Sequence, residues 1–156
     1  MDMVDVNIVE IKNFDNRLIA RIKELENKNL GSKASINEWV IPVIIRYGKL
    51  AVVQKADDGE IIGVCELIKN WDDNQSAFVH SFYIDREFRA QGIGKIFLSK
   101  IISMLKAENL KTIELTVDPE NEAALKLYKK YGFAVIDLRK DEYGSGIDRY
   151  LMRLKL

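Results

Sequence analysis

The sequence predicts an α/β fold with a mixed β-sheet flanked by helices. Two observations carry this prediction. Stretches of alternating or β-branched apolar residues are typical of strands, and stretches with apolar residues three or four positions apart are typical of helices. Along the 156 residues these stretches follow the order β-α-α-β-β-β-α-β-α-β-β. No repeat or proline-rich linker divides the chain, so we expect a single domain over residues 1–156.

The first elements are a strand and two helices. Apolar and polar residues alternate over 4–11, and helical spacing follows over 15–29, where Gly31 provides a stop. Residues 35–47 predict a second, irregular helix. Pro42 lies inside this helix, so we expect a break there.

Three strands come next. Residues 50–55 and 60–68 flank an Asp57-Asp58-Gly59 turn, which predicts a hairpin. A polar loop over 71–75 then precedes a third strand over 77–84.

The second half of the chain alternates between helices and strands. Asp118 is placed to cap a helix that starts at Pro119, and Gly132 is placed to end it. The predicted elements are a helix over 92–107, a strand over 112–117, a helix over 119–131 and strands over 133–139 and 147–154.

Composition narrows the class of protein. Basic and acidic residues number 24 each, so no net charge favours nucleic acid or an anionic membrane, and any anion site must be local. Cys65 is the one cysteine, which favours a reducing compartment. The acidic first residues do not resemble a signal peptide, and no apolar run approaches the ~18 residues of a membrane span. We therefore expect a cytoplasmic protein with no nucleic-acid or membrane partner.

A glycine-containing turn opens the helix over 92–107. Its sequence is Arg89-Ala90-Gln91-Gly92-Ile93-Gly94-Lys95. The first N–H groups of a helix lack partners and glycines let a ligand approach, so the turn suits a phosphate or pyrophosphate, with Arg89 and Lys95 adding positive charge. Phe97 stands where a Rossmann turn needs its third glycine, and Ile96 stands where a P-loop needs serine or threonine. Alone, the segment is equally compatible with a tight turn that binds nothing.

Two motifs together resemble one family. The turn matches [Q/R]-x-x-G-x-[G/A], and residues 121–133 match N-x-x-A-x-x-L-Y-x-x-x-G-F. One helix and one strand separate them. Both motifs and the element order resemble the GCN5-related N-acetyltransferase (GNAT) superfamily. The resemblance implies a single N-acetyltransferase domain that uses acetyl-CoA as co-substrate, without a metal.

The resemblance also implies which residues contact the cofactor. The CoA pyrophosphate would lie on the turn, and the pantetheine arm would pair with the end of the preceding strand. There a backbone N–H would also face the developing oxyanion. Asn121 matches the asparagine of the family that contacts CoA. The implied contacts are Phe82, Tyr83, Ile84, Arg89, Ala90, Gln91, Gly92, Ile93, Gly94, Lys95 and Asn121.

The resemblance implies direct attack of an amine on the thioester in a ternary complex. A CoA thiol with a pKa near ~8.5 leaves more easily beside an acid. Tyr128 lies two helical turns after Asn121 and matches the general acid of many family members. The alternative is that Tyr128 is a core aromatic residue.

The general base stays open. An amine with a pKa near ~10.4 must lose a proton before it attacks. His80 stands nine residues before Arg89, the offset of a catalytic histidine in arylalkylamine N-acetyltransferases, and a core histidine is the alternative. Ribosomal-protein alanine acetyltransferases carry a glutamate where this chain has Thr116. Glu114 has the same strand parity but fits a solvated or paired carboxylate better, and a water molecule is a further candidate.

The acceptor is the least specified part. Residues 143–152 are similar to the closing segment of protein N-terminal acetyltransferases, and Trp39 and Tyr47 lie where the family lines its acceptor pocket. The acceptor is therefore a small amine or a protein or peptide amine. Cys65 fits a small buried residue better than a nucleophile. Family members are often dimers, so a homodimer is compatible with the resemblance.

Two other functions remain open at this stage. One is a non-catalytic acyl-CoA-binding or sensor module of the same fold, which the missing glutamate base leaves open. The other is an α/β interaction domain in which the glycine turn is only a turn.

Overall fold

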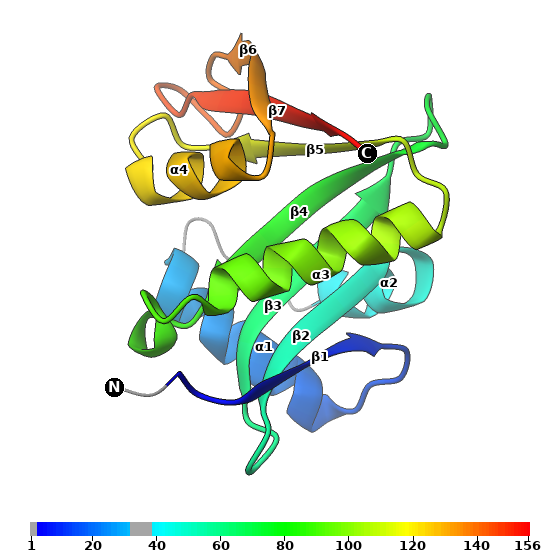
Figure 1. Ribbon diagram of the computed structural model, residues 1–156, viewed down its shortest axis with the longest axis vertical. Coiled ribbons are helices and arrows are strands. Elements are labelled where there is room, and N and C mark those ends of the chain that lie inside the picture. Colours follow the sequence, from blue (N-terminus) through cyan, green and yellow to red (C-terminus); the bar gives the residue numbers. More distant parts are fainter. Residues whose placement is uncertain (1–2, 32–38) are drawn as a thin grey trace. The chain divides into compact units, whose positions relative to one another are not determined.

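The protein forms one mixed sheet of seven strands with four α-helices, counted over the parts that the computed structural model describes, residues 3–31 and 39–156 (Figure 1). The strand order is β1-β2-β3-β4-β5-β7-β6. The predicted α/β class and element order are confirmed. The elements are β1 (Val6–Ile11), α1 (Asn16–Leu30), α2 (Val40–Tyr47), β2 (Lys49–Lys55), β3 (Ile61–Lys69), β4 (Ser76–Ile84), a 3-10 turn (Arg86–Phe88), α3 (Ile93–Ala107), β5 (Thr112–Val117), α4 (Glu122–Lys130), β6 (Ala134–Arg139) and β7 (Arg149–Lys155).

The chain separates into two compact units. Unit 1 consists of Met1–Ile68 and Ser81–Ile101, and unit 2 consists of Lys69–His80 and Ile102–Leu156. Strand β4 and helix α3 each contribute residues to both units. The single domain over 1–156 stays a prediction.

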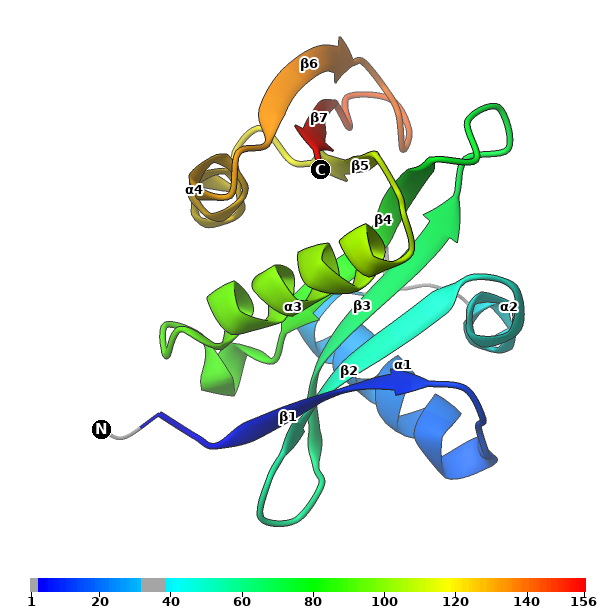
Figure 2. The ribbon, with the colours of Figure 1, turned by 45° about the vertical axis from the view of Figure 1, so that its right-hand side comes forward.

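Unit 1 is built on antiparallel strands. β2 pairs with β1 and β3 (Figure 2). Leu50 and Val52 of β2 belong to a core shared with α1 and α2. Helix α3 packs on the opposite side, where Phe97 stacks on Phe82 of β4 with ring centroids 5.2 Å apart. The first core consists of Ile22, Leu25, Ile41, Ile44, Ile45, Leu50, Val52, Ile61, Val64 and Tyr83.

The helix boundaries in unit 1 follow local capping. Asp15 caps α1 by accepting a hydrogen bond from the Leu18 amide (2.9 Å), and Gly31 follows with φ of 77°. The predicted break at Pro42 is wrong. α2 begins at Val40, so Pro42 lies in the first turn, where a backbone N–H has no helical partner to lose. Residues 35–38 of the predicted helix lie outside the described residues.

No helix in the described parts of the chain has both the length and the hydropathy that a membrane span requires.

Unit 2 combines parallel and antiparallel pairing. The Ser76–Val79 part of β4 runs parallel to β5, and β7 pairs antiparallel with both β5 and β6. The register between β6 and β7 shifts between Val135 and Asp137. Helix α4 lies alongside β5 and ends at Lys130, two residues before Gly132 (Figure 1). A Cβ at Gly132 would lie 3.2 Å from the Leu154 side chain of β7.

Two predicted elements in unit 2 begin too early. Helix α4 starts at Glu122 and not at Pro119, because Asp118 accepts from the Glu120 amide (2.9 Å) and leaves Asn121 to cap the helix. Strand β7 starts at Arg149 and not at Ile147. The preceding loop instead closes on itself, with the Gly146 amide donating to Asp141 (2.5 Å).

Candidate functional site

The turn between β4 and α3 has the backbone conformation that the glycine motif predicts. Ala90 and Gly92 have φ of 61° and 83°, both in the left-handed region. α3 begins at Ile93, and the amides of Lys95 and Ile96 donate to the Gly92 carbonyl at 3.1 and 3.3 Å. The N–H groups that precede them have no helical acceptor. Left-handed residues just before a helix aim successive N–H groups into one concavity, which suits an anion.

The loop that leads into this turn is anchored by a buried carboxylate. Asp85 accepts from the Lys28 ammonium (3.0 Å) and the Glu87 amide (3.3 Å), and its own amide donates to the Ile62 carbonyl (2.7 Å). Burial raises the pKa of Asp85, but these hydrogen bonds and the Lys28 charge outweigh it and hold the pKa below its usual value. Hydrogen bonds to Glu87 and Asp85 raise the pKa of Lys28.

Arg89 is held by the protein. Its Nε donates to the Ile84 carbonyl (2.9 Å) and its Nη2 donates to Oδ1 of Asn29 (3.3 Å). The predicted contribution of Arg89 to the charge at the ligand stays a prediction. Its guanidinium also ties the turn to the end of β4 and to α1. Lys95 is exposed at the start of α3.

The end of β4 presents little polar side-chain surface. Tyr83 and Ile84 are buried, and Phe82 is half-buried against Phe97. The Tyr83 hydroxyl is buried without a hydrogen-bond partner among the described residues, and burial raises its pKa far above the usual value. A cofactor contact at these three residues would therefore use the backbone, as the family resemblance implies.

His80 is exposed on β4. The alternative of a core histidine is therefore wrong. Its role as the general base stays a prediction.

The other candidates for base or nucleophile are engaged or buried. Glu114 accepts from the Nε of Arg153 (2.8 Å), so it is a paired carboxylate as predicted. The Thr116 and Tyr143 hydroxyls are hydrogen-bonded at 3.1 Å. Cys65 is fully buried, and burial followed by the charge of Glu66 raises the pKa of its thiol. Cys65 is thus the small buried residue that the sequence predicts.

Helix α4 carries the two residues of the second motif. The Asn121 side chain accepts from the Ala124 amide (3.1 Å) and caps the helix. Tyr128 is 7% exposed and packs against Phe133 with ring centroids 5.6 Å apart. The ring therefore belongs to the packing of unit 2. Proton donation by the Tyr128 hydroxyl stays a prediction.

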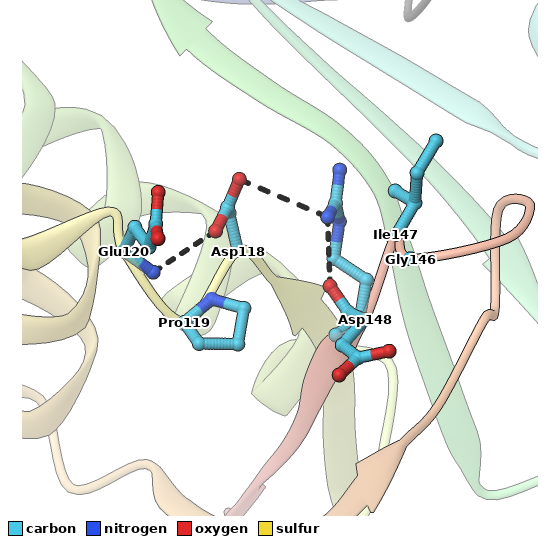
Figure 3. Close-up of a pocket in the computed structure, with 7 residues that line it drawn as sticks. Asp118, Pro119, Glu120, Gly146, Ile147 and Asp148 are labelled. Atoms are coloured by element: carbon cyan, nitrogen blue, oxygen red, sulfur yellow. Dashed lines mark hydrogen bonds and ion pairs between the residues drawn. The ribbon is translucent and has the colours of Figure 1, made fainter.

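A pocket of about 370 Å³ lies in unit 2, between the β5–α4 turn and the loop before β7 (Figure 3). Arg149 lies 3.8 Å from Asp118, donates to the Asp148 carbonyl (2.8 Å), and stacks over the Tyr143 ring at 5.2 Å. Asp118 and Pro119 face Asp148 and Ile147 across the pocket. The lining residues are Asp118, Pro119, Glu120, Gly146, Ile147, Asp148 and Arg149.

The sequence predicts only part of this pocket. Residues 143–152 are predicted to contact the acceptor, whereas Asp118 is predicted to cap a helix. The signal that could have found Asp118 is its place directly after β5, because binding residues collect at the carboxyl ends of sheet strands. Trp39 and Tyr47, at the two ends of α2, are both exposed. Their contact with an acceptor stays a prediction.

The comparison with protein families decides the classification. Residues 19–133 match the acetyltransferase (GNAT) family. The chain belongs to this family. The matched segment contains the turn as well as Asn121 and Tyr128 of the second motif, and it ends before β6. The predicted GNAT family is confirmed, and the chain carries an acyltransferase-type domain.

Two curated relatives illustrate the GNAT similarity. An uncharacterized N-acetyltransferase of Methanocaldococcus jannaschii is 35% identical over 69 residues, which is 44% of this chain and 30% of that protein. A [ribosomal protein bS18]-alanine N-acetyltransferase of Haemophilus ducreyi is 36% identical over 84 residues, 51% of this chain and 58% of that protein. The matched stretches thus span less than two thirds of either relative.

Solved structures share the GNAT fold over nearly the whole chain. Ard1 from Thermoplasma volcanium has a TM-score of 0.84 and 22% identity, with 97% of each chain covered. A chain of the NatC complex bound to Gag peptide and CoA has a TM-score of 0.80 and 21% identity, with 96% of this chain and 99% of that chain covered.

Proposed function

We propose that this protein transfers the acetyl group of acetyl-CoA to a primary amine by direct attack in a ternary complex. The observation that carries the proposal is the turn before α3, where Ala90 and Gly92 take left-handed φ values. This conformation aims N–H groups at one anion, and the turn lies inside the segment that matches the GNAT family. The anion that we assign to it is the pyrophosphate of CoA.

The residues suit a two-part proton transfer. The amine nitrogen attacks the thioester carbonyl carbon and forms the C–N bond, and the amine proton passes to His80 or to a water molecule. The tetrahedral intermediate then breaks its C–S bond, and the leaving thiolate takes a proton from the Tyr128 hydroxyl. A backbone N–H at the end of β4 stabilises the oxyanion in between. The Thr116 hydroxyl is hydrogen-bonded to the Tyr143 hydroxyl. Thr116 also lacks a carboxylate, so it does not serve as the base.

We favour a peptide or protein amine as the acceptor. The pocket of unit 2 is formed by the loop before β7, the segment that resembles protein N-terminal acetyltransferases. The H. ducreyi relative is named for acetylation of a ribosomal-protein alanine, and the NatC structure holds a peptide. The pocket carries three carboxylates against one guanidinium, which favours a cationic group. Such a substrate and the single Cys65 fit the cytoplasm.

Binding and turnover test the proposal in two steps. Isothermal titration with acetyl-CoA is expected to show binding, and absence of binding at millimolar ligand would contradict a CoA site. A panel of small amines and of peptides with free α-amines, followed by thiol release, is then expected to give turnover with peptides. Binding without turnover of any amine would favour the non-catalytic acyl-CoA-binding module.

A further inference from the structure

The last turn of α1 is fastened to the loop that carries the donor turn. We propose that Asn29 is a positioning residue for acetyl-CoA, which acts by holding the segment from Ile84 to Gly94 in the shape that binds the pyrophosphate. This inference rests on the proposed acetyl-CoA site. Neither motif of the family includes Asn29, which lies about 60 residues before the turn.

Asn29 connects three backbone segments through one amide group. Its Nδ2 donates to the Leu25 carbonyl in the last turn of α1 (2.8 Å). Its Oδ1 accepts from the Arg86 amide (2.8 Å) and from Nη2 of Arg89 (3.3 Å). The donor bond fixes the orientation of the side-chain amide, so the oxygen faces the loop. Asn29 therefore links α1 to both ends of the 86–89 segment.

Arg89 carries this link to the strand. With Nη2 on Asn29, its Nε donates to the Ile84 carbonyl at 2.9 Å. Ile84 ends β4, and Ala90 follows Arg89 directly with a strained φ of 61°. A non-glycine residue keeps such a conformation only where its surroundings hold it. The Asn29–Arg89 pair is a contact that holds it.

A second set of contacts joins the same two segments. The Arg86 guanidinium donates to the Lys28 carbonyl, which is one of the terminal carbonyls that a helix leaves unsatisfied. Lys28 in turn bridges Asp85 (3.0 Å) and Glu87 (2.6 Å). Loss of Asn29 alone therefore leaves α1 attached to the loop. The loop stays folded while the turn loses the contact that orients it.

The test compares two asparagines of the same helix. Asn29→Ala is expected to raise the Kd for acetyl-CoA roughly tenfold, because it removes hydrogen bonds that include a charged partner. Asn27→Ala, on the exposed side of α1, is the matched control and should leave the Kd unchanged. Asn29→Asp keeps the acceptor oxygen toward Arg86 and Arg89 and should restore most of the affinity. Failure of this rescue contradicts the proposed acceptor role.

A truncated donor separates positioning from general damage. Acetyl-pantetheine lacks the pyrophosphate, so Asn29→Ala should leave kcat/KM for acetyl-pantetheine close to that of the unaltered protein while KM for acetyl-CoA rises. Equal losses with both donors would show a merely structural role and overturn the inference. Unchanged affinity for acetyl-CoA in Asn29→Ala would also overturn it. If the unaltered protein does not bind acetyl-CoA, the proposed function itself fails.

A double-mutant cycle tests the route through Arg89. Asn29→Ala and Arg89→Ala should each weaken acetyl-CoA binding, and the double variant should lose less than the sum of the two single losses, because both variants remove the Asn29–Arg89 contact. Arg89→Lys should behave like Arg89→Ala, since an ammonium cannot reach Ile84 and Asn29 together. Additive losses, or full binding in Arg89→Lys, would show that Arg89 acts on the phosphate by charge and not through Asn29.

Discussion

The proposed donor turn of unit 1 and the proposed acceptor pocket of unit 2 are both formed by loops, but they are held in different ways. Asn29, Lys28 and Asp85 fasten the donor turn, and Asp85 is only 2% exposed. The pocket is lined by exposed and half-buried side chains, with Ile147 39% exposed and the Arg149 to Asp118 pair among them. The family match contains the donor turn and the β5–α4 side of the pocket, and it ends before the loop that precedes β7. A rigidly held turn suits a constant ligand, and an open pocket suits a variable one.

The largest expected effect is on the acetyl-transfer step, for which Tyr128 is the proposed general acid. Tyr128→Phe removes the proposed acid and should lower kcat about 100-fold, within the range for general acids, with the Kd for acetyl-CoA unchanged. Tyr131→Phe, at the residue that follows the same helix as its C-cap, is the control. Thiol release under saturating acceptor measures kcat. Full turnover in Tyr128→Phe would assign this tyrosine to packing only, against Phe133.

Removal of the buried carboxylate tests the fastening of the donor turn. Asp85→Asn loses charge-assisted hydrogen bonds and should cost about 2 kcal/mol of unfolding free energy near neutral pH. The pKa of Asp85 is lowered in the folded protein, so this contribution is present above its ordinary value near ~3.9 and is lost as the pH falls through the lowered value. Chemical denaturation at pH 7 and pH 3 should show a difference that shrinks in acid. A constant difference would contradict the ionic role.

A backbone substitution tests the turn itself. Gly92 has φ of 83°, and a Cβ there would make only an ordinary contact, 3.9 Å from the Met3 sulfur. Gly92→Val therefore strains the backbone by roughly 1–2 kcal/mol and should weaken acetyl-CoA binding about tenfold. Gly59 has a similar φ of 73° in the β2–β3 hairpin, and Gly59→Val is the matched control. Calorimetry should show weakened binding for the first variant only. Equal affinities in both would show that the turn geometry does not matter for binding.

The smallest expected effect belongs to the acceptor pocket. Arg149→Ala removes a half-buried guanidinium that lies 3.8 Å from the exposed Asp118 carboxylate. Ion pairs at the protein surface contribute at most about 1 kcal/mol, so KM for a peptide acceptor should change by no more than about fivefold. The Kd for acetyl-CoA should not change. Arg139→Ala, which breaks a similar pair with Glu142, serves as control. A change in acetyl-CoA affinity with Arg149→Ala would contradict the proposal that the cofactor and the acceptor bind to separate regions.

The sequence predicted strands, turns and the stop of the first helix well, because their signals are local. Gly31 and the Asp57-Asp58-Gly59 turn are found where their backbone preferences place them. The predicted break at Pro42 was wrong because the effect of a proline depends on its distance from the helix start. The start of α2 at Val40 was not evident from the sequence. The predicted start of α4 at Pro119 was wrong because the Asp118 side chain accepts from the Glu120 amide in the turn before the helix.

What the sequence determined by itself is the element order and the donor turn. Both rest on periodicity, on left-handed residues and on spacing within short stretches, and these are properties of neighbours in the chain. Tertiary structure alone decided that His80 is exposed, that Cys65 is buried beside Glu66, and that Arg89 faces Asn29. Burial and long-range hydrogen bonds join residues that the chain keeps far apart, so no local pattern encodes them.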